Sequence, residues 1–276
     1  MTLARQFTAE ARFLHISAAL DIYSEPYSLA LYGLAISGDM DVGESIAQGN
    51  DARRNLAQDE VMAAAKAHGI PFCRRDCLGT AAPIAQAVFC PVTARAKDCI
   101  PAAGRLADLI VIARERADAH ADLSGILCGL FDTARPVLVV PEQDGVVATP
   151  TYEAGAVIAW DGSLPATRAL YNALPLLRNA KQIQVICIRN PKASSDFNRF
   201  DDIAHWLDLH SLPAHVARIE SDAESVPETI LRKALAFQAE YIVMGAYGHS
   251  HIGQMLLGGA TNQILKHSAM PILLSH

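Results

Sequence analysis

The chain lacks the long apolar stretches and targeting segments that mark several large protein classes. No uncharged apolar run of 18 residues occurs among its 276 residues, so the sequence predicts no membrane-spanning helix. The first residues, MTLARQFTAEARFLHIS, contain neither the apolar region nor the small-residue cleavage pattern of a signal peptide. The net charge of −6 disfavours a nucleic-acid backbone as a partner. We therefore expect a globular protein with no nucleic-acid or membrane partner.

Cysteine is present, but its spacing is wrong for metal binding. The six cysteines include no Cys-x2-Cys pair and no Cys/His ligand spacing, so we expect no metal site. Most of them stand among apolar neighbours, which is typical of buried, reduced thiols. Reduced thiols predict a cytoplasmic protein.

Catalytic signatures are also missing. The chain has no GxxxxGK[ST] phosphate loop, no GxGxxG after a strand and no GxSxG nucleophile elbow. No general base or lysine clamp stands beside the glycine-rich segment Gly245–Thr261. We therefore name no catalytic residue and expect binding without turnover, with slow ATP hydrolysis left as an alternative.

Apolar runs and helical patterns alternate along the whole chain, which predicts parallel sheets with crossover helices. The second half predicts five strands and four helices, enough for one complete doubly wound α/β domain. The strands are expected at residues 156–160, 182–188, 214–219, 241–244 and 271–274, and the helices at 164–177, 201–210, 226–239 and 260–268.

The first half gives a shorter set of elements. Strands are expected at residues 12–17, 71–77, 108–113 and 136–140, helices at 51–68 and 123–133, and a helical or loop-rich stretch up to Leu106. ARPVLVVPE matches AMPILLSH, and LADLIVIAR matches QAEYIVMGA, so the halves form a weak internal repeat of roughly 130 residues. With a turn-rich boundary near residues 143–150, we predict domains at 1–145 and 153–276.

The last 36 residues hold the main candidate site. The apolar run at 241–244 ends in Gly245 and Gly248, and Gly258 and Gly259 precede a helix that starts near Ala260. Glycines at the carboxyl end of a strand let backbone amides approach an anion, and a helix N-terminus adds unpaired donors. The alternative is that these glycines only permit tight packing between strand and helix.

The spacing Gly245-x2-Gly248-x9-Gly258, with the words MGAYGHS, LLGGATNQILKHS and MPILLSH, resembles the nucleotide loop of the universal stress protein family. The resemblance implies two tandem doubly wound, Rossmann-like parallel-sheet domains with strand order 3-2-1-4-5. By the same comparison the first domain is incomplete and lacks its first, central strand. Either that domain closes its sheet differently or borrows a strand from a partner, or the start site is annotated too late; both explanations stay open.

The resemblance also implies an ATP site, with or without Mg²⁺, in the second domain. An acidic residue at Asp161 is expected to contact the adenosine end, although Asp161 also suits a helix cap beside Ser163. The residues expected to bind the cofactor are Ala159, Trp160, Asp161, Met244, Gly245, Gly248, His249, Gly258, Gly259, Ala260 and Thr261. The family has Ser or Thr where this chain has Gly259, and the lost hydroxyl is expected to weaken binding by roughly ten- to a hundredfold.

The first half has no counterpart of the glycine loop. The matching position reads Ala113-Arg114-Glu115-Arg116-Ala117-Asp118, which indicates a solvated turn or, alternatively, a site for some other anion.

The resemblance therefore implies a universal stress protein that binds ATP or a related adenine nucleotide as a stress-response sensor or regulator. The alternatives are an interaction module that has lost nucleotide binding and a slow ATPase. The closing strands of the two domains are expected to pair as an internal pseudo-dimer, with further homodimerisation.

Overall fold

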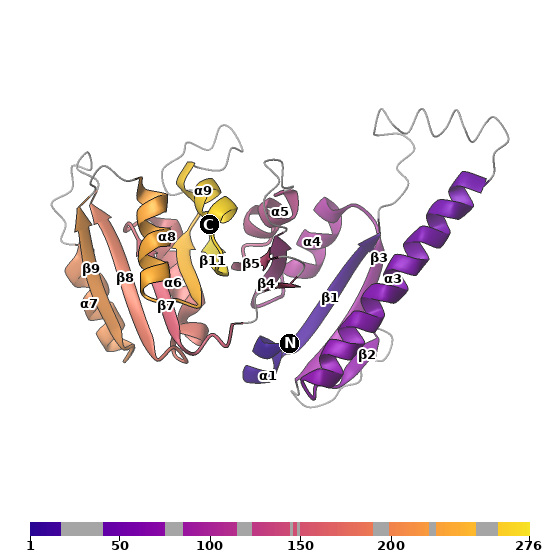
Figure 1. Ribbon diagram of the computed structural model, residues 1–276, viewed down its shortest axis with the longest axis horizontal. Helices are drawn as coiled ribbons and strands as arrows, with labels where there is room; N and C mark the ends of the chain where they lie inside the picture. Colours follow the sequence, from indigo (N-terminus) through magenta and orange to yellow (C-terminus); the bar gives the residue numbers. More distant parts are fainter. Residues whose placement is uncertain are drawn as a thin grey trace. The chain divides into compact units, whose positions relative to one another are not determined.

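The computed structural model describes residues 1–17, 41–74, 85–114, 123–143, 146–147, 150–189, 199–220, 225–246 and 259–276. The chain divides into two compact units, Met1–Cys99 and Ile100–His276 (Figure 1). Over these described ranges, no helix is both long enough and apolar enough to cross a membrane.

The second unit is built on one large sheet. Its strands lie side by side in the order β4 (Ile110–Arg114), β5 (Val137–Gln143), β11 (Ile272–Ser275), β10 (Tyr241–Gly245), β7 (Gly155–Trp160), β8 (Gln182–Arg189) and β9 (Ala214–Glu220). A short strand, β6 (Val146–Val147), pairs with β5. The order β9-β8-β7-β10-β11 is the predicted 3-2-1-4-5 arrangement, and these strands are parallel throughout. The doubly wound fold of the second half is therefore confirmed.

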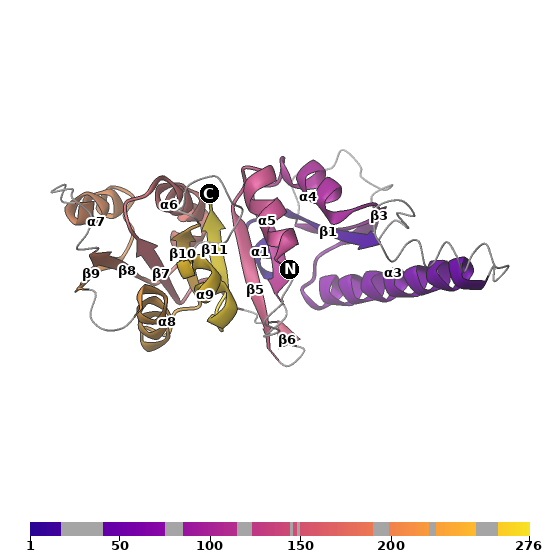
Figure 2. The same ribbon diagram turned by 90° about the horizontal axis from the view of Figure 1, so that it is seen from above.

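Helices cover both faces of this part of the sheet. Figure 2 shows α6 (Leu164–Leu177) and α7 (Arg199–Leu209) on one face, and α8 (Val226–Ala236) and α9 (Gly259–His267) on the other. The bounds of α6 are those predicted, because strong local signals set them. Ser163 caps its first turn by accepting a hydrogen bond from Ala166 N at 3.2 Å, and the small residues Ala169 and Ala173 face the core.

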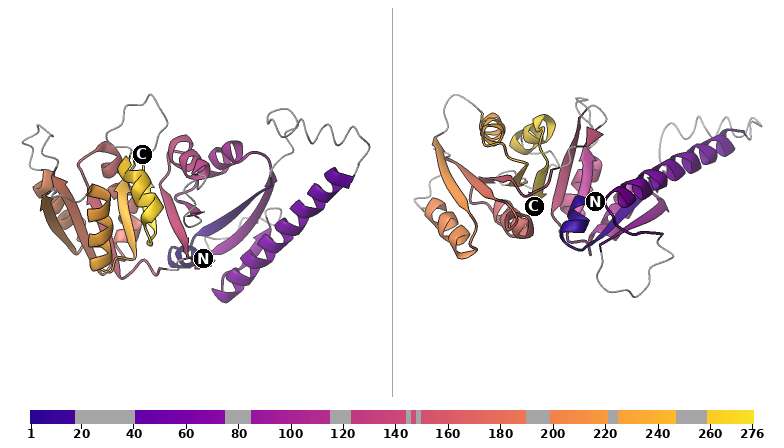
Figure 3. Two further views of the ribbon diagram at one scale, coloured as in Figure 1. Left: turned by 45° about the horizontal axis from the view of Figure 1, so that its top comes forward. Right: turned by 60° about the horizontal axis from the view of Figure 1, so that its bottom comes forward.

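The two halves of the chain meet in the second unit through antiparallel pairing of β5 with β11. Leu138 lies opposite Leu273, and Val139 opposite Ile272, so the predicted pairing of the closing strands is confirmed. One apolar core contains Leu130 of α5 (Ser124–Asp132) together with Ile264 and Leu265 of α9. Figure 3 shows α9 beside β11 in this unit.

The first unit contains a parallel sheet in the order β1 (Glu10–Ser17), β3 (Gln86–Thr93) and β2 (Phe72–Arg74). Helix α3 (Asp41–Ala67) packs on this sheet through Val61 and Ala65, which share a core with Ala4 of α1 (Thr2–Gln6). Helix α4 (Ala96–Gly104) follows β3. In the residues that the structure describes, this sheet and the large sheet are separate.

Strand β3 corrects the sequence interpretation, which expected helix or loop there. Pro91 within QAVFCPVT argues against a central strand, because proline has no amide to donate. The amides of Gln86 and Ala94 donate toward β1, whereas that of Ala87 donates toward β2. By alternation the nitrogen of Pro91 faces β2, whose described pairing ends at Arg74 opposite Phe89. Pro91 therefore removes no donor from the hydrogen bonds between β3 and β1.

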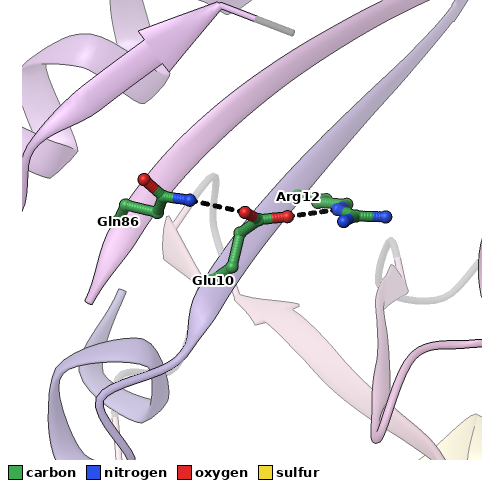
Figure 4. Close-up of polar contacts among 3 residues, drawn as sticks. All are labelled: Glu10, Arg12 and Gln86. Carbon is green, nitrogen blue, oxygen red and sulfur yellow. Dashed lines mark hydrogen bonds and ion pairs between the residues drawn. The ribbon is translucent and has the colours of Figure 1, made fainter. Parts of the chain in front are cut away.

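Polar side chains fix the register of β1 and β3 at their first residues. Glu10 lies opposite Gln86, whose Nε2 donates to the carboxylate at 2.5 Å, and Arg12 Nε also donates to Glu10 (Figure 4). Partial burial raises the pKa of Glu10, but the bonds from Arg12 and Gln86 and the charge of Arg12 together lower it below its usual value. A slip of one residue would break these contacts and turn every side chain of β1 to the other face.

Candidate functional site

Two adjacent strands bring the predicted site residues to one edge of the sheet. Strand β7 pairs in parallel with β10, and Ala159 lies opposite Met244. From β7 the chain continues to β8 on one side, whereas β10 lies on the other side, so the strand order reverses here. Ligands of open α/β sheets bind at the carboxyl edge beside such a switch point. Ala159, Trp160, Asp161, Met244 and Gly245 all lie at this edge.

Asp161 is exposed and organises the turn that leads into α6. Its Oδ1 accepts a hydrogen bond from Ser163 N at 2.9 Å, and Gly162 between them has a φ of 74°. That left-handed conformation suits glycine. The helix cap is Ser163, so Asp161 supports the cap from outside the helix and keeps an exposed carboxylate at the sheet edge.

Gly245 is fixed by packing against α6. A Cβ built on Gly245 would lie 2.3 Å from Ala166 N and 2.6 Å from the carbonyl carbon of Pro165, both backbone atoms of the first turn of α6. No side chain fits there without displacing the helix. The packing alternative from the sequence therefore accounts for this glycine.

The other strand residues differ in which face they occupy. Ala159 and Met244 pack with the core shared by α8 and α9, and Met244 is buried. Successive residues of a strand point to opposite faces, so Trp160 lies on the α6 and α7 face, beside its register partner Cys187. Trp160 is thus on the opposite face of the sheet from α9.

Helix α9 begins on the same side of the sheet as the carboxyl end of β10. Gly259 and Ala260, its first two residues, are exposed, whereas Thr261 is buried. The amides of a first helical turn have no partner inside the helix and point outward with the positive end of the dipole. A Cβ on Gly259 would meet nothing within 4 Å. Three predicted site residues, Gly248, His249 and Gly258, lie outside the described residues.

Two contacts were not predicted, one at this edge and one at the opposite edge of the sheet. His276 Nδ1 lies 3.3 Å from the carbonyl oxygen of Ala246, and its ring makes an edge contact with Phe131 of α5 at 4.6 Å between centroids. The interpretation of Arg114 as part of a solvated turn is wrong, because this side chain is 6% exposed and its Nη2 donates to Ser268 O at 2.8 Å. Both contacts join the two halves of the chain. In the sequence, the related signal was the match of ARPVLVVPE with AMPILLSH, which predicted that the closing strands pair.

Titratable groups do not gather as metal ligands in the parts of the chain that are described, where no three His, Cys, Asp or Glu side chains come together. Cys99 and Cys187 are buried free cysteines. The edge between β7 and β10 thus offers exposed helix amides and one carboxylate, a combination suited to holding an anion with a polar group at its other end.

Comparisons with known proteins agree with this fold. The sequence profile of the universal stress protein family matches residues 156–276. A universal stress protein from Archaeoglobus fulgidus has a TM-score of 0.64 at 14% identity, with 99% of this chain and 90% of that chain covered. A Pseudomonas aeruginosa protein assigned provisionally to the family has a TM-score of 0.51 at 15% identity, covering 98% of this chain and 94% of that one.

A universal stress protein solved with cAMP covers 45% of this chain and 97% of its own length, with a TM-score of 0.37 at 18% identity. A search of curated proteins gave no match. The fold thus agrees over the whole length of tandem relatives, and the sequence agrees over the second half. Residues 156–276 thus carry the match to the universal stress protein family, and over the rest of the chain the likeness is one of fold.

Proposed function

We propose that the second half binds ATP or a related adenine nucleotide, with or without Mg²⁺, and that the protein works as a stress-response sensor or regulator without turnover. The observation that supports this most is the meeting of Asp161, the end of β10 and the first turn of α9 at one switch point. The proposed ligand lies with its adenosine end toward Asp161 and its phosphates toward the amides of Gly259 and Ala260. Gly248, His249 and Gly258, which lie outside the described residues, are proposed to bind the same ligand.

The two halves are proposed to act as an internal pseudo-dimer through β5 and β11, with further homodimers formed between chains. A binding protein for ATP works where ATP is plentiful and thiols stay reduced, which places it in the cytoplasm. The free thiols of Cys99 and Cys187 fit that compartment.

Gly259 provides the sharpest test, because it is the position where this chain departs from its family. Gly259→Ser adds a hydroxyl in open space beside the proposed phosphates. One hydrogen bond to a charged group is worth about 1.5–3 kcal/mol, so ATP affinity should rise by roughly ten- to a hundredfold. Gly259→Ala is the matched control, since it adds the Cβ and helix propensity without the hydroxyl.

Isothermal titration of ATP and Mg²⁺ into the purified full chain measures the three affinities. A serine variant that binds no tighter than the alanine variant would contradict the placement of the phosphates at α9. If wild type, Gly259→Ser and Gly259→Ala all fail to bind millimolar ATP, the result would instead favour an interaction module. Gly245 is compatible with that alternative, because packing alone explains why this position is a glycine. Phosphate release that disappears in Asp161→Ala would identify a slow ATPase.

A further inference from the structure

Arg114 joins the first half of the chain to the end of α9. It is the last residue of β4, and its side chain is only 6% exposed. Its Nη2 donates a hydrogen bond of 2.8 Å to the carbonyl oxygen of Ser268, the residue that follows α9. Hydrogen bonds from an ionised donor are shorter and stronger than neutral ones. When such a bond is buried, dissolved salt weakens it only slightly. This contact therefore restrains the carboxyl end of α9.

The same end of α9 is also fixed from within. Ser268 N donates to Ile264 O at 2.9 Å, and Ser268 Oγ donates to Met270 O at 2.8 Å. Arg114 adds a positive charge where the helix dipole is negative, which favours this arrangement further. The helix end thus has a single geometry, set partly by a residue about 150 positions earlier in the chain.

Strand β4 and α9 also belong to one core. Ile110 and Ile112 lie on the same face of β4 as Arg114, because strand side chains alternate. Both pack against the apolar cluster that contains Ile264 and Leu265 of α9. Arg114 therefore extends this contact by a directional bond at the edge of the shared core, where apolar packing alone would allow α9 to slide or tilt.

A restraint at one end of a short helix also fixes the position of the other end. Helix α9 has 9 residues and is about 13 Å long, so it moves as a rigid rod. A tilt at Ser268 displaces Gly259 and Ala260, whose amides face the proposed phosphates. Binding groups that shift by about 0.5 Å lose much of their contribution, so the position of this helix matters for affinity.

The repeat explains why an arginine stands here. In the match of LADLIVIAR with QAEYIVMGA, Arg114 takes the place of Ala246, which in the second half leads into the glycine loop. The first half has lost that loop, and its strand end now contacts the helix of the other half. Arg114 serves a carbonyl oxygen of the protein, which disfavours the earlier alternative that it binds a separate anion.

We propose that Arg114 is a positioning residue for the phosphate-binding turn of α9, so that the degenerate first half tunes nucleotide affinity in the second. This role rests on the proposed nucleotide site and goes beyond it by naming a residue that touches no ligand. Its signature is selectivity: loss of Arg114 weakens ligands in proportion to their phosphates and leaves adenosine alone.

The test compares Arg114→Met and Arg114→Lys with wild type by titrating ATP, ADP, AMP and adenosine into the full chain. Circular dichroism first confirms that each variant is folded at the titration temperature. Arg114→Met should weaken ATP roughly tenfold and adenosine less than twofold, and Arg114→Lys, which keeps the charge, should recover part of the loss. Arg135→Met is the matched control, because Arg135 Nε donates to Arg105 O within the first half.

Equal ATP affinity in wild type and folded Arg114→Met would overturn the proposal. So would an equal loss for all four ligands, which indicates a general loss of structure. If the methionine variant does not fold, the lysine variant carries the same comparison, with roughly threefold for ATP and no change for adenosine expected. Wild type that binds none of the four ligands rejects the nucleotide site itself and this role with it.

Discussion

Glu240 is expected to hold the segment that leads into β7, and its replacement tests this polar cluster of the second unit. Its carboxylate accepts hydrogen bonds from Thr151 N at 3.1 Å, Thr151 Oγ1 at 2.9 Å, and Glu153 N and Ala154 N, both at 3.0 Å. These donors all belong to residues 151–154, the short segment just before β7. The carboxylate of Glu240, which directly precedes β10, therefore holds the segment before β7 in place.

The magnitude follows from the exposure of the group. Hydrogen bonds to a charged group contribute about 1.5–3 kcal/mol each when buried, but this carboxylate is largely solvated, so the cluster as a whole is worth about 2 kcal/mol. Glu240→Ala should lower the free energy of unfolding by that amount, and Glu240→Gln, which keeps one acceptor oxygen, by about 1 kcal/mol. Thermal midpoints should fall by about 4–8 °C and 2–4 °C respectively.

The effect depends on pH with a defined sign. Partial burial raises the pKa of Glu240, but the bonds from Ala154, Thr151 and Glu153 outweigh it and lower the pKa below its usual value. A depressed folded pKa gives stability that is present above the unfolded value, about 4.3, and is lost as the pH falls through the folded value. The midpoints of wild type and Glu240→Gln should differ at pH 7, and this difference should be smaller at pH 3.5.

Circular dichroism melts at both pH values measure these midpoints. Glu153→Gln is the matched control, because Glu153 is an exposed carboxyl in the same segment and is expected to shift the midpoint by less than about 1 °C. A Glu240→Gln midpoint equal to that of wild type at pH 7, or a difference as large at pH 3.5 as at pH 7, would refute the reasoning.

Three further outcomes follow from single contacts. Gly245→Ala should lower the free energy of unfolding by about 3 kcal/mol, because the added methyl group meets the backbone of Ala166. Gly259→Ala places its methyl group in open space and should not lower this free energy. Equal thermal midpoints for the two variants would contradict this expectation. Ser163→Ala should cost about 1 kcal/mol through the lost cap of α6, measured by urea unfolding. Burial raises the pKa of Cys187 to about 12, although Arg218 opposes this, so Cys187 should resist iodoacetamide at pH 8 until the protein unfolds, as mass spectrometry of its peptide can show.

Local signals explain how much of the fold was predictable. The bounds of α6 were predicted because Ser163 and the small-residue stripe act within the helix itself. Strand β3 was not, because Pro91 argues against a strand unless its nitrogen faces away from β1, and that depends on how β3 pairs in the folded chain. Neighbouring chain segments, and not the sequence of β3 alone, decide its structure.

The candidate site shows the same limit. The sequence placed Asp161 and Gly245 at the ends of two strands, and the pairing of Ala159 with Met244 confirms that these ends are adjacent. It could not assign Gly245 to packing, because the first turn of α6 approaches it only in the folded chain. The burial of Thr261 likewise depends on how α9 is rotated about its axis.

The boundaries of the family match and of the folded unit differ, and the difference has a physical cause. The family profile covers residues 156–276, whereas the compact unit starts at Ile100. The added residues supply β4, α5 and β5. Strand β5 pairs with β11, and all three elements contribute to a core that includes Ile264. Without them β11 would be an exposed edge of apolar residues, which natural sheets avoid. A half without a glycine loop of its own is therefore retained because the other half is incomplete without it.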